Sequence, residues 1–200
     1  MKSMYWQTTH RYGIRLPKSI KEAKELDQKN GNTLWWDAIT KEMRNVRIAF
    51  EDWNKPLSEM LPGYSNLTCH LIFGIKLSEN FRRKARFVVD GHKHHVKLSV
   101  SYSTVVSRDS VRIVFLLATL NSVEILSCDI QNAYLSAPCR ETFYHVAGDE
   151  FGSEKGKVFI AKRALYGLRT SGATFRTFIV ESFHDMGFKP CNMADPDVWI

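Results

Sequence analysis

Asp129 is the residue of this sequence that most clearly suggests chemistry. It lies at the end of an apolar run, residues 123–130, and begins the stretch Asp-Ile-Gln-Asn-Ala-Tyr-Leu. An aspartate at the end of a buried strand is costly unless its carboxylate reaches solvent or binds a cation. Mg²⁺ prefers carboxylate oxygens and usually keeps several waters. The residues alone leave two interpretations open, a ligand of a hard metal ion or a turn aspartate that caps the next segment.

Four cations lie close together in residues 81–87, Phe-Arg-Arg-Lys-Ala-Arg-Phe. On a strand, Arg82, Lys84 and Arg86 share one face and Arg83 lies on the other. Three cations on one strand face repel one another unless an anion binds between them. A triphosphate or a nucleic-acid phosphate would therefore suit this face. The alternative is a solvated edge strand that its charges protect from pairing with other strands.

A third stretch, residues 163–175, reads Arg-Ala-Leu-Tyr-Gly-Leu-Arg-Thr-Ser-Gly-Ala-Thr-Phe. Gly167 allows a close approach of the backbone to another group, and the N-terminus of the helix that Ser171 is expected to cap favours anions. Considered alone, a Tyr-Gly-Leu sequence before a helix is an ordinary loop.

Together, the three stretches resemble motifs of copia-type retrotransposon reverse transcriptases. The first palm motif of that family has an aspartate, three further residues, and then a small residue and an aromatic one, as in residues 129–134. Residues 163–175 resemble its Leu-Tyr-Gly-Leu-Lys-x-Ser motif, and residues 84–88 resemble its Lys-Ala-Arg-Leu-Val fingers strand. The likeness extends from about residue 33 to residue 200, with the motifs in the family's order.

The resemblance implies a role for each residue. Asp129 would bind both catalytic Mg²⁺ (or Mn²⁺) ions, assisted by the carbonyl of Ile130. Tyr134, beside Ala133, would lie under the sugar of the incoming nucleotide and exclude a 2′-hydroxyl, although plain core packing is the rival role. The other implied contacts are Lys84 or Arg86 with the triphosphate, Tyr166 and Gly167 with the nascent base pair and template, Arg169 with a phosphate, and Arg82 and Arg83 with nucleic acid.

One family motif does not occur in these 200 residues. The Tyr-x-Asp-Asp sequence that supplies the other acidic ligands would fall beyond Ile200. Two-metal phosphoryl transfer needs several carboxylates around ions about 4 Å apart. Asp195 and Asp197 would precede the catalytic hairpin and are not expected to replace it. The chain is therefore expected to be truncated before the active site is complete, and to lack activity alone.

The expected fold class is α+β, namely the fingers and partial palm of a right-hand polymerase. The resemblance divides the chain into a helical lead-in (1–60), fingers (61–110 and 138–170) and palm (111–137 and 171–200). The spacing of capping and apolar residues predicts the elements. The expected helices are at 20–29, from 32 or 33 to 46, at 107–120 between two layers, and at 171–187. The last of these is expected to face a core with Phe175, Phe178, Ile179, Phe183 and Met186. The expected strands are at 69–77, 81–89, 123–130 (buried), 143–146, 157–161 and 198–200.

The charge of the chain is concentrated in its first half. Residues 1–100 carry 18 Lys and Arg against 10 Asp and Glu, whereas residues 101–200 carry 10 against 11, so the net charge of +7 comes from the first half. This asymmetry suggests a polyanionic partner, or a basic surface that only maintains solubility. The composition, 44% hydrophobic and 12% aromatic, excludes disorder for most of the chain.

Cysteines, histidines and the N-terminus point away from export and from metal chelation. The four cysteines have no ligand-like spacing and are expected to be reduced, mostly buried thiols; they are Cys69, Cys128, Cys139 and Cys191. His92, His94 and His95 form no usual zinc arrangement. The first twenty residues have no apolar leader, and no run of about 18 apolar residues occurs. A protein that is neither secreted nor membrane-bound is expected.

The implied function is templated nucleotidyl transfer by part of an RNA-directed DNA polymerase. Its partners would be an RNA template, a DNA primer, deoxynucleotides and the remainder of a retrotransposon polyprotein, in cytoplasmic virus-like particles or in the nucleus. Two other classes stay open, a non-enzymatic nucleic-acid-binding remnant and an unrelated basic α+β interaction domain. The second requires all three motif matches to be accidental.

Overall fold

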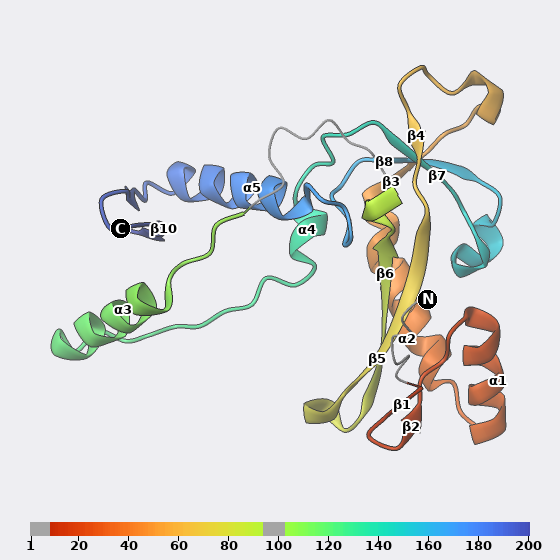
Figure 1. Ribbon diagram of the computed structural model, residues 1–200, viewed down its shortest axis with the longest axis horizontal. Coiled ribbons are helices and arrows are strands. Elements are labelled where there is room, and N and C mark those ends of the chain that lie inside the picture. Colours follow the sequence, from red (N-terminus) through yellow and green to blue (C-terminus); the bar gives the residue numbers. More distant parts are fainter. Residues whose placement is uncertain (1–8, 94–102) are drawn as a thin grey trace, which may run out of the picture.

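The computed structural model describes residues 9–93 and 103–200 and combines helices with short strands (Figure 1). The α-helices of this described part are α1 (Ile20–Asn30), α2 (Leu34–Val46), α3 (Arg108–Leu120), α4 (Ala133–Ser136) and α5 (Ser171–Asp185). The strands are β1 (His10–Arg11), β2 (Ile14–Arg15), β3 (Phe50–Asp52), β4 (Ser65–Asn66), β5 (Cys69–Lys76), β6 (Arg82–Val89), β7 (Phe143–Val146), β8 (Val158–Ala161), β9 (Pro190–Cys191) and β10 (Asp195–Trp199). Short 3-10 helices lie at Arg47–Ala49, Leu57–Glu59, Leu77–Glu79, Gly91–Lys93 and Asp149–Glu154.

The ends of α1 follow the predicted capping pattern. The Ser19 hydroxyl accepts a hydrogen bond from the backbone N–H of Glu22 at 3.1 Å, and Gly31 ends the helix in the left-handed region at φ 64°. The Glu22 carboxylate reaches back to the N–H of Lys18 at 2.9 Å and not to that of Ser19. The start and end of this helix, and those of α2, are therefore confirmed.

A buried carboxylate joins the two N-terminal helices. Asp27, on the last turns of α1, accepts hydrogen bonds from the backbone N–H groups of Trp35 at 3.1 Å and Trp36 at 2.8 Å. Its negative charge lies at the N-terminus of α2, where the helix dipole favours it. The apolar stripe of α2 packs as predicted: Trp35, Ile39, Met43 and Val46 are buried and Trp36 is half-buried.

The core lies between α2, the β5–β6 hairpin and a four-stranded sheet of order β3-β8-β7-β4. The β5–β6 register runs from Cys69 opposite Val89 to Lys76 opposite Arg82, which confirms the predicted hairpin. The predicted strands at 143–146 and 157–161 are also confirmed, as β7 and β8. In the sheet, β4 pairs with β7 in parallel and the other pairs are antiparallel.

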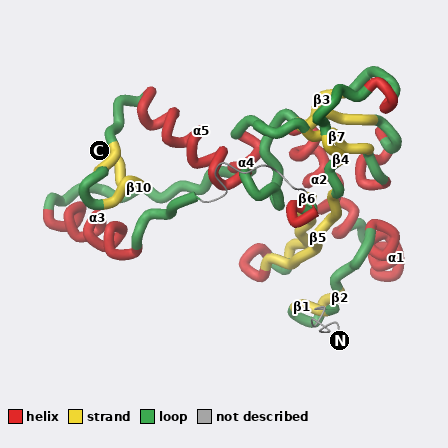
Figure 2. Tube along the Cα trace, turned by 45° about the horizontal axis from the view of Figure 1, so that its top comes forward, coloured by secondary structure: helices red, strands yellow, loops and turns green. Residues whose placement is uncertain are grey.

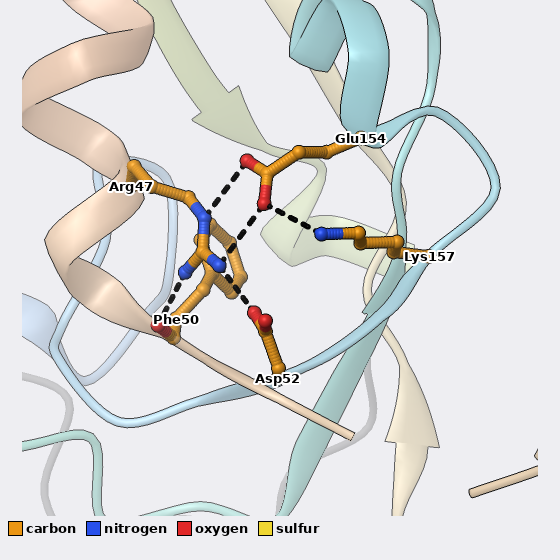
Figure 3. Close-up of polar contacts among 5 residues, drawn as sticks. All are labelled: Arg47, Phe50, Asp52, Glu154 and Lys157. Carbon is orange, nitrogen blue, oxygen red and sulfur yellow. Dashed lines mark hydrogen bonds and ion pairs between the residues drawn. The ribbon is translucent and has the colours of Figure 1, made fainter. Parts of the chain in front are cut away.

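Arg47, which follows α2, ties that helix to the sheet (Figure 3). Its Nε donates to Glu154 at 3.0 Å, its Nη1 donates to the Phe50 carbonyl at 2.8 Å, and its Nη2 donates to Asp52. The guanidinium also lies 4.5 Å from the centre of the Phe159 ring. One side chain therefore holds β3, β8 and the 3-10 segment after β7 in place.

The elements α3, α5 and β9–β10 form an arm that extends from this body (Figure 1, Figure 2). The predicted helix at 107–120 is confirmed in its extent, and the Ser107 hydroxyl caps it by accepting from the N–H of Ser110 at 3.0 Å. Its predicted place between two layers is wrong. No α3 residue is buried, and Leu120 is 71% exposed, because the described part of the chain has no layer over its apolar side.

The predicted buried strand at 123–130 is also wrong. This segment has no regular secondary structure and is exposed throughout, with Leu126 at 92%. A strand needs a neighbour for its backbone hydrogen bonds, and no described strand pairs with this segment. Its apolar residues indicate a strand, but residue type alone does not supply a partner.

The C-terminal helix and strand differ from expectation in detail. Thr170 and not Ser171 is the N-cap of α5, and the Ser171 hydroxyl donates instead to the Leu165 carbonyl at 2.6 Å. The predicted core face is only partly confirmed: Phe175, Phe178, Ile179 and Phe183 are half-buried, whereas Met186 is 62% exposed. The predicted strand at 198–200 overlaps the end of β10, which begins at Asp195, ends at Trp199 and pairs with β9.

The division into lead-in, fingers and palm stays a prediction. The four-stranded sheet takes strands from three of the five predicted segments: β3 from 1–60, β4 from 61–110, and β7 and β8 from 138–170. The lead-in therefore shares a core with both predicted finger segments.

We expect Arg47→Ala to lower the free energy of unfolding by about 1–3 kcal/mol, because half-buried Glu154, exposed Asp52 and the Phe50 carbonyl all lose the hydrogen bonds that Arg47 donates. Arg44→Ala, one turn earlier on α2 at an exposed position, is the matched control and should change stability by less than about 0.5 kcal/mol. Urea unfolding followed by tryptophan fluorescence measures both. Equal effects of the two substitutions would contradict a structural role for Arg47.

Candidate nucleic-acid interface

A cleft of about 370 Å³ lies between α2, β6 and the loop that precedes α4. Its cationic lining residues come from several elements and are Lys41, Lys76, Arg82, Arg83, Lys84 and Arg86. Among the described residues, the carboxylates that also line it are those of Glu42 and Asp129. The cleft is therefore strongly basic, and its chemistry suits an anion that carries several charges.

Alternation along β6 decides which cations face the cleft. Ala85, Phe87 and Val89 are buried on the core face, so Lys84 and Arg86 project from the opposite one, as predicted. Lys84 is half-buried, and burial lowers its pKa, an effect that the neighbouring Arg86 and Lys76 charges increase. Crowding of cations at one site makes binding of an anion favourable.

The other two arginines of the strand are partly engaged. Arg82 donates to the carboxylate of Glu79 in the β5–β6 turn. Arg83 lies with its guanidinium 5.6 Å from the centre of the Trp35 ring and donates to the Phe81 carbonyl at 2.7 Å. Lys84 and Arg86 form no ion pair within the described residues and project from the face opposite the core, so they are the cations of β6 that are most open to a ligand in the cleft.

Glu42 fixes the outer edge of β6, although the sequence motifs predicted no role for it in the site. Its carboxylate accepts a hydrogen bond from the Phe87 N–H at 2.9 Å. Burial raises the pKa of Glu42, while this hydrogen bond and the charges of Lys84 and Arg86 oppose the shift. The sequence feature that could have indicated this contact is the position of Glu42 on α2, where an acidic residue borders the buried stripe one turn after Ala38.

Gly167 makes the close backbone approach that the sequence predicted. Its φ is 93°, and a Cβ atom there would lie 2.1 Å from the Val89 carbonyl oxygen. In the same contact, a Cβ on Gly91 would lie 2.0 Å from the Gly167 carbonyl oxygen, and the Tyr166 carbonyl accepts from the Val89 N–H at 2.8 Å. In the protein alone, the group approached is therefore the end of β6.

Two tyrosine rings, tilted by 52° to each other, are in contact at the cleft. The Tyr166 ring lines the cleft, with the Arg86 guanidinium 5.8 Å from its centre. The Tyr134 ring lies 4.8 Å from Tyr166 and 6.0 Å from Phe175, between centres. Burial raises the pKa of Tyr166, which keeps its hydroxyl protonated. Tyr134 is therefore one ring removed from the cleft lining, next to Ala133 at the start of α4.

Asp129 borders the cleft from an exposed loop and not from a strand. The loop ends at Asn132, whose φ of 54° turns the chain into α4. The Asp129 carboxylate and the Ile130 carbonyl are two groups whose oxygens could bind a metal ion. No group of three His, Cys, Asp or Glu suited to a metal occurs in the described part of the chain. These donors alone therefore do not form a two-metal site.

The remaining candidate residues lie away from the cleft. The Asp195 carboxylate accepts from Ser107 N–H at 2.9 Å and from the Ser110 hydroxyl at 2.7 Å, and Asp197 accepts from Arg176 at 2.7 Å. Both aspartates are thus engaged in the arm. Arg169 is exposed, and its Cγ would lie 3.6 Å from a Cβ on Gly91. The cleft therefore unites Lys84, Arg86, Asp129, Ile130 and Tyr166, but not Arg169, Tyr134 or Gly167.

All four cysteines are free thiols. Burial raises the pKa of Cys69 and raises that of Cys139 to about 12, and both residues are half-buried, as is Cys191. Cys128 is exposed, which corrects the expectation for that residue. His92 lies in a 3-10 turn, and His94 and His95 lie outside the described residues.

Residues 63–195 match the family model described as "Reverse transcriptase (RNA-dependent DNA polymerase)". The match covers more than half of the chain, and the chain therefore belongs to this family. It is also similar to the "Retrovirus-related Pol polyprotein from transposon TNT 1-94" of Nicotiana tabacum, at 28% identity over 162 residues. This similarity confirms the resemblance to copia-type reverse transcriptases.

The aligned part covers 78% of this chain but only 12% of the tobacco polyprotein. The chain thus spans about an eighth of the length of the curated relative that it matches. No solved structure is significantly similar to it. Among residues 9–93 and 103–200, no helix has the length and apolar character needed to cross a membrane.

We expect Gly167→Ala to destabilise the protein by at least about 2 kcal/mol more than Gly156→Ala does. Both glycines have a positive φ, 93° and 85°, so both substitutions cost about 1 kcal/mol or more of backbone strain. Only the Gly167 substitution adds an overlap with Val89, since nothing lies within 4 Å of a Cβ on Gly156. Equal losses in urea unfolding would show that the loop is not pressed against β6.

Proposed function

We propose that this chain forms the nucleotide- and template-binding part of an RNA-directed DNA polymerase encoded by a copia-type retrotransposon. The observation that carries the proposal is the basic cleft, in which Lys84 and Arg86 meet Asp129 and Tyr166 from distant parts of the sequence. The reaction of the whole enzyme is attack of a primer 3′-hydroxyl on the α-phosphate of a deoxynucleotide, with pyrophosphate as the leaving group.

The elements have the arrangement of the fingers and part of the palm of a right-hand polymerase in this proposal. Pairing of β4 with β7 supports it, because these strands come from the two proposed finger segments, 61–110 and 138–170. Packing of α4 against α5 supports it in the same way for the proposed palm segments, 111–137 and 171–200. The lead-in, 1–60, completes the finger core through α2 and β3.

Lys84 and Arg86 bind the triphosphate of the incoming nucleotide. The half-buried Lys84 ammonium lies among other cations, so a polyphosphate relieves their mutual repulsion as it binds. The Tyr166 ring contacts the Arg86 guanidinium. In the complex, Tyr166 and Gly167 pack near the nascent base pair. Tyr134 is wedged between Tyr166 and Phe175, and this fixed ring excludes a 2′-hydroxyl by its bulk. Arg82, Arg83 and Arg169 contact nucleic-acid phosphates.

The cleft binds substrates without completing catalysis. Asp129 and the Ile130 carbonyl do not make a two-metal site, and the Mg²⁺ or Mn²⁺ chemistry of the enzyme requires more carboxylates than this sequence brings there. The other carboxylates would come from the remainder of the polyprotein. The partners are an RNA template, a DNA primer and deoxynucleotides, in cytoplasmic virus-like particles or in the nucleus, without secretion.

The double substitution Lys84→Ala/Arg86→Ala should weaken binding of single-stranded and hybrid oligonucleotides of every sequence. Because binding releases counterions from phosphates, the slope of log affinity against log salt should become shallower by about 1.4. Fluorescence anisotropy across a salt series measures this slope. Lys55→Ala/Lys189→Ala removes two exposed charges elsewhere and should leave it unchanged. A native chain that binds with a flat salt dependence would favour an unrelated interaction domain.

Primer extension on an RNA template with Mg²⁺ or Mn²⁺ tests catalysis. We expect no extension by the 200-residue chain, because a single exposed carboxylate cannot hold both ions. A longer chain that continues through a Tyr-x-Asp-Asp motif should extend the primer, and Asp129→Asn should abolish its activity. Extension by the short chain that Asp129→Asn removes would refute the expected inactivity. Failure of the longer chain would favour a non-enzymatic nucleic-acid-binding remnant.

A further inference from the structure

A second concave surface lies beside the cleft, between the β1–β2 hairpin and α1. Its volume is about 970 Å³, and Arg83 lines both this surface and the cleft. We name it the N-terminal groove, after its lining residues from 10–32. These residues precede the segment 63–195 that matches the family model, so the family match assigns them nothing.

The N-terminal groove has more cationic side chains than its carboxylates can pair with. Two of its cations have partners: Arg15 pairs with Glu22 at 2.6 Å, and Lys21 pairs weakly with Glu25 at 4.0 Å. Within the described residues, three further cations of the groove form no ion pair, and these are Lys18, Lys29 and Arg83. The groove therefore keeps a positive charge that an anion can neutralise.

Arg83 stands at the junction of the groove and the cleft. Its Nη1 donates to the Phe81 carbonyl, and its buried Nε has no hydrogen-bond partner among the described residues. An arginine offers five N–H donors, so this guanidinium keeps donors for a phosphate. Because Arg83 lines both surfaces, it can contact a phosphate of a strand that passes from the cleft into the groove.

The β1–β2 turn lies beside the β5–β6 turn (Figure 1). Each turn contributes one exposed aromatic ring to a contact between them. Tyr12 and Phe81 are 49% and 40% exposed, and their ring centres are 6.3 Å apart. Arg11 holds its guanidinium 5.5 Å from the centre of the Tyr12 ring. Both aromatic residues have a positive φ, 53° and 56°. Bulky side chains rarely adopt this conformation, and such strain is concentrated at binding sites.

We propose that the N-terminal groove and this ring pair bind a single-stranded nucleic acid, as a continuation of the strand held in the cleft. The phosphates lie along Lys18, Lys29 and Arg83, and a base stacks on Tyr12 or Phe81. Tyr12 precedes Gly13, which lines the groove. A basic groove with exposed aromatic rings next to its lining residues is the combination that single strands require. This inference rests on the proposed function, because the cleft supplies the other end of the strand.

Anisotropy with the full 200-residue chain and labelled single-stranded RNA tests the groove. The probes are oligonucleotides of about 4 and about 16 nucleotides, of which only the longer reaches beyond the cleft. Tyr12→Asn should weaken the longer probe about 5- to 100-fold through loss of stacking, and asparagine tolerates the positive φ. Tyr12→Trp should preserve its affinity. Lys18→Ala/Lys29→Ala should make the salt slope for the longer probe shallower by about 1.4.

The short probe and Lys55→Ala/Lys189→Ala serve as controls and should be insensitive to the groove, and thermal unfolding verifies that each variant folds. If the groove variants bind the longer probe as the native chain does, while Lys84→Ala/Arg86→Ala weakens both probes, the inference is overturned and the proposed function stands. If the native chain binds neither probe, the proposed function fails first. Competition by polyglutamate that equals competition by unlabelled RNA would overturn the inference in favour of acidic peptides.

Discussion

The outer edge of β6 is the constraint on which the basic cleft depends. A strand at the edge of a hairpin exposes N–H groups that need partners. Here the carboxylate of Glu42 accepts from Phe87 and the carbonyl of Tyr166 accepts from Val89. These two hydrogen bonds attach α2 and the Gly167 loop to one strand. Because the strand is held on this edge, its alternation directs Phe87 into the core and Lys84 and Arg86 toward the cleft.

The same arrangement explains how several cations can lie close together in the cleft although they repel one another. Glu42 lies close to Lys84 and Arg86 and lowers the cost of placing them together, yet its hydrogen bond engages it with the backbone. The cations therefore lie beside a carboxyl group that is held in place and keep their capacity for a ligand. Asp129, from the loop before α4, lines the same cleft.

Local signals in the sequence predicted the body of the protein well. The cap at Ser19, the stripe of α2 and the alternation of β5 and β6 each depend on neighbours within a few residues, and each is confirmed. The contact of Gly167 was predicted in kind, but its partner at Val89 depends on tertiary structure. The prediction of a strand at 123–130 was wrong because an apolar run forms a strand only when another strand pairs with it. Glu42 was missed because a hydrogen bond to a distant strand edge leaves no local pattern.

The pairing of β3 with β8 has a consequence for synthesis of the protein. Phe50–Asp52 find their partners in Phe159–Ala161, more than a hundred residues later in the chain. A ribosome adds roughly 5–20 residues per second, so the nascent N-terminal half waits several seconds before this sheet can close. During that interval Phe50 and the adjoining face of α2 are without their final cover. A chaperone that recognises short apolar segments would meet this protein at that stage, and would lose its binding site once residue 161 has emerged.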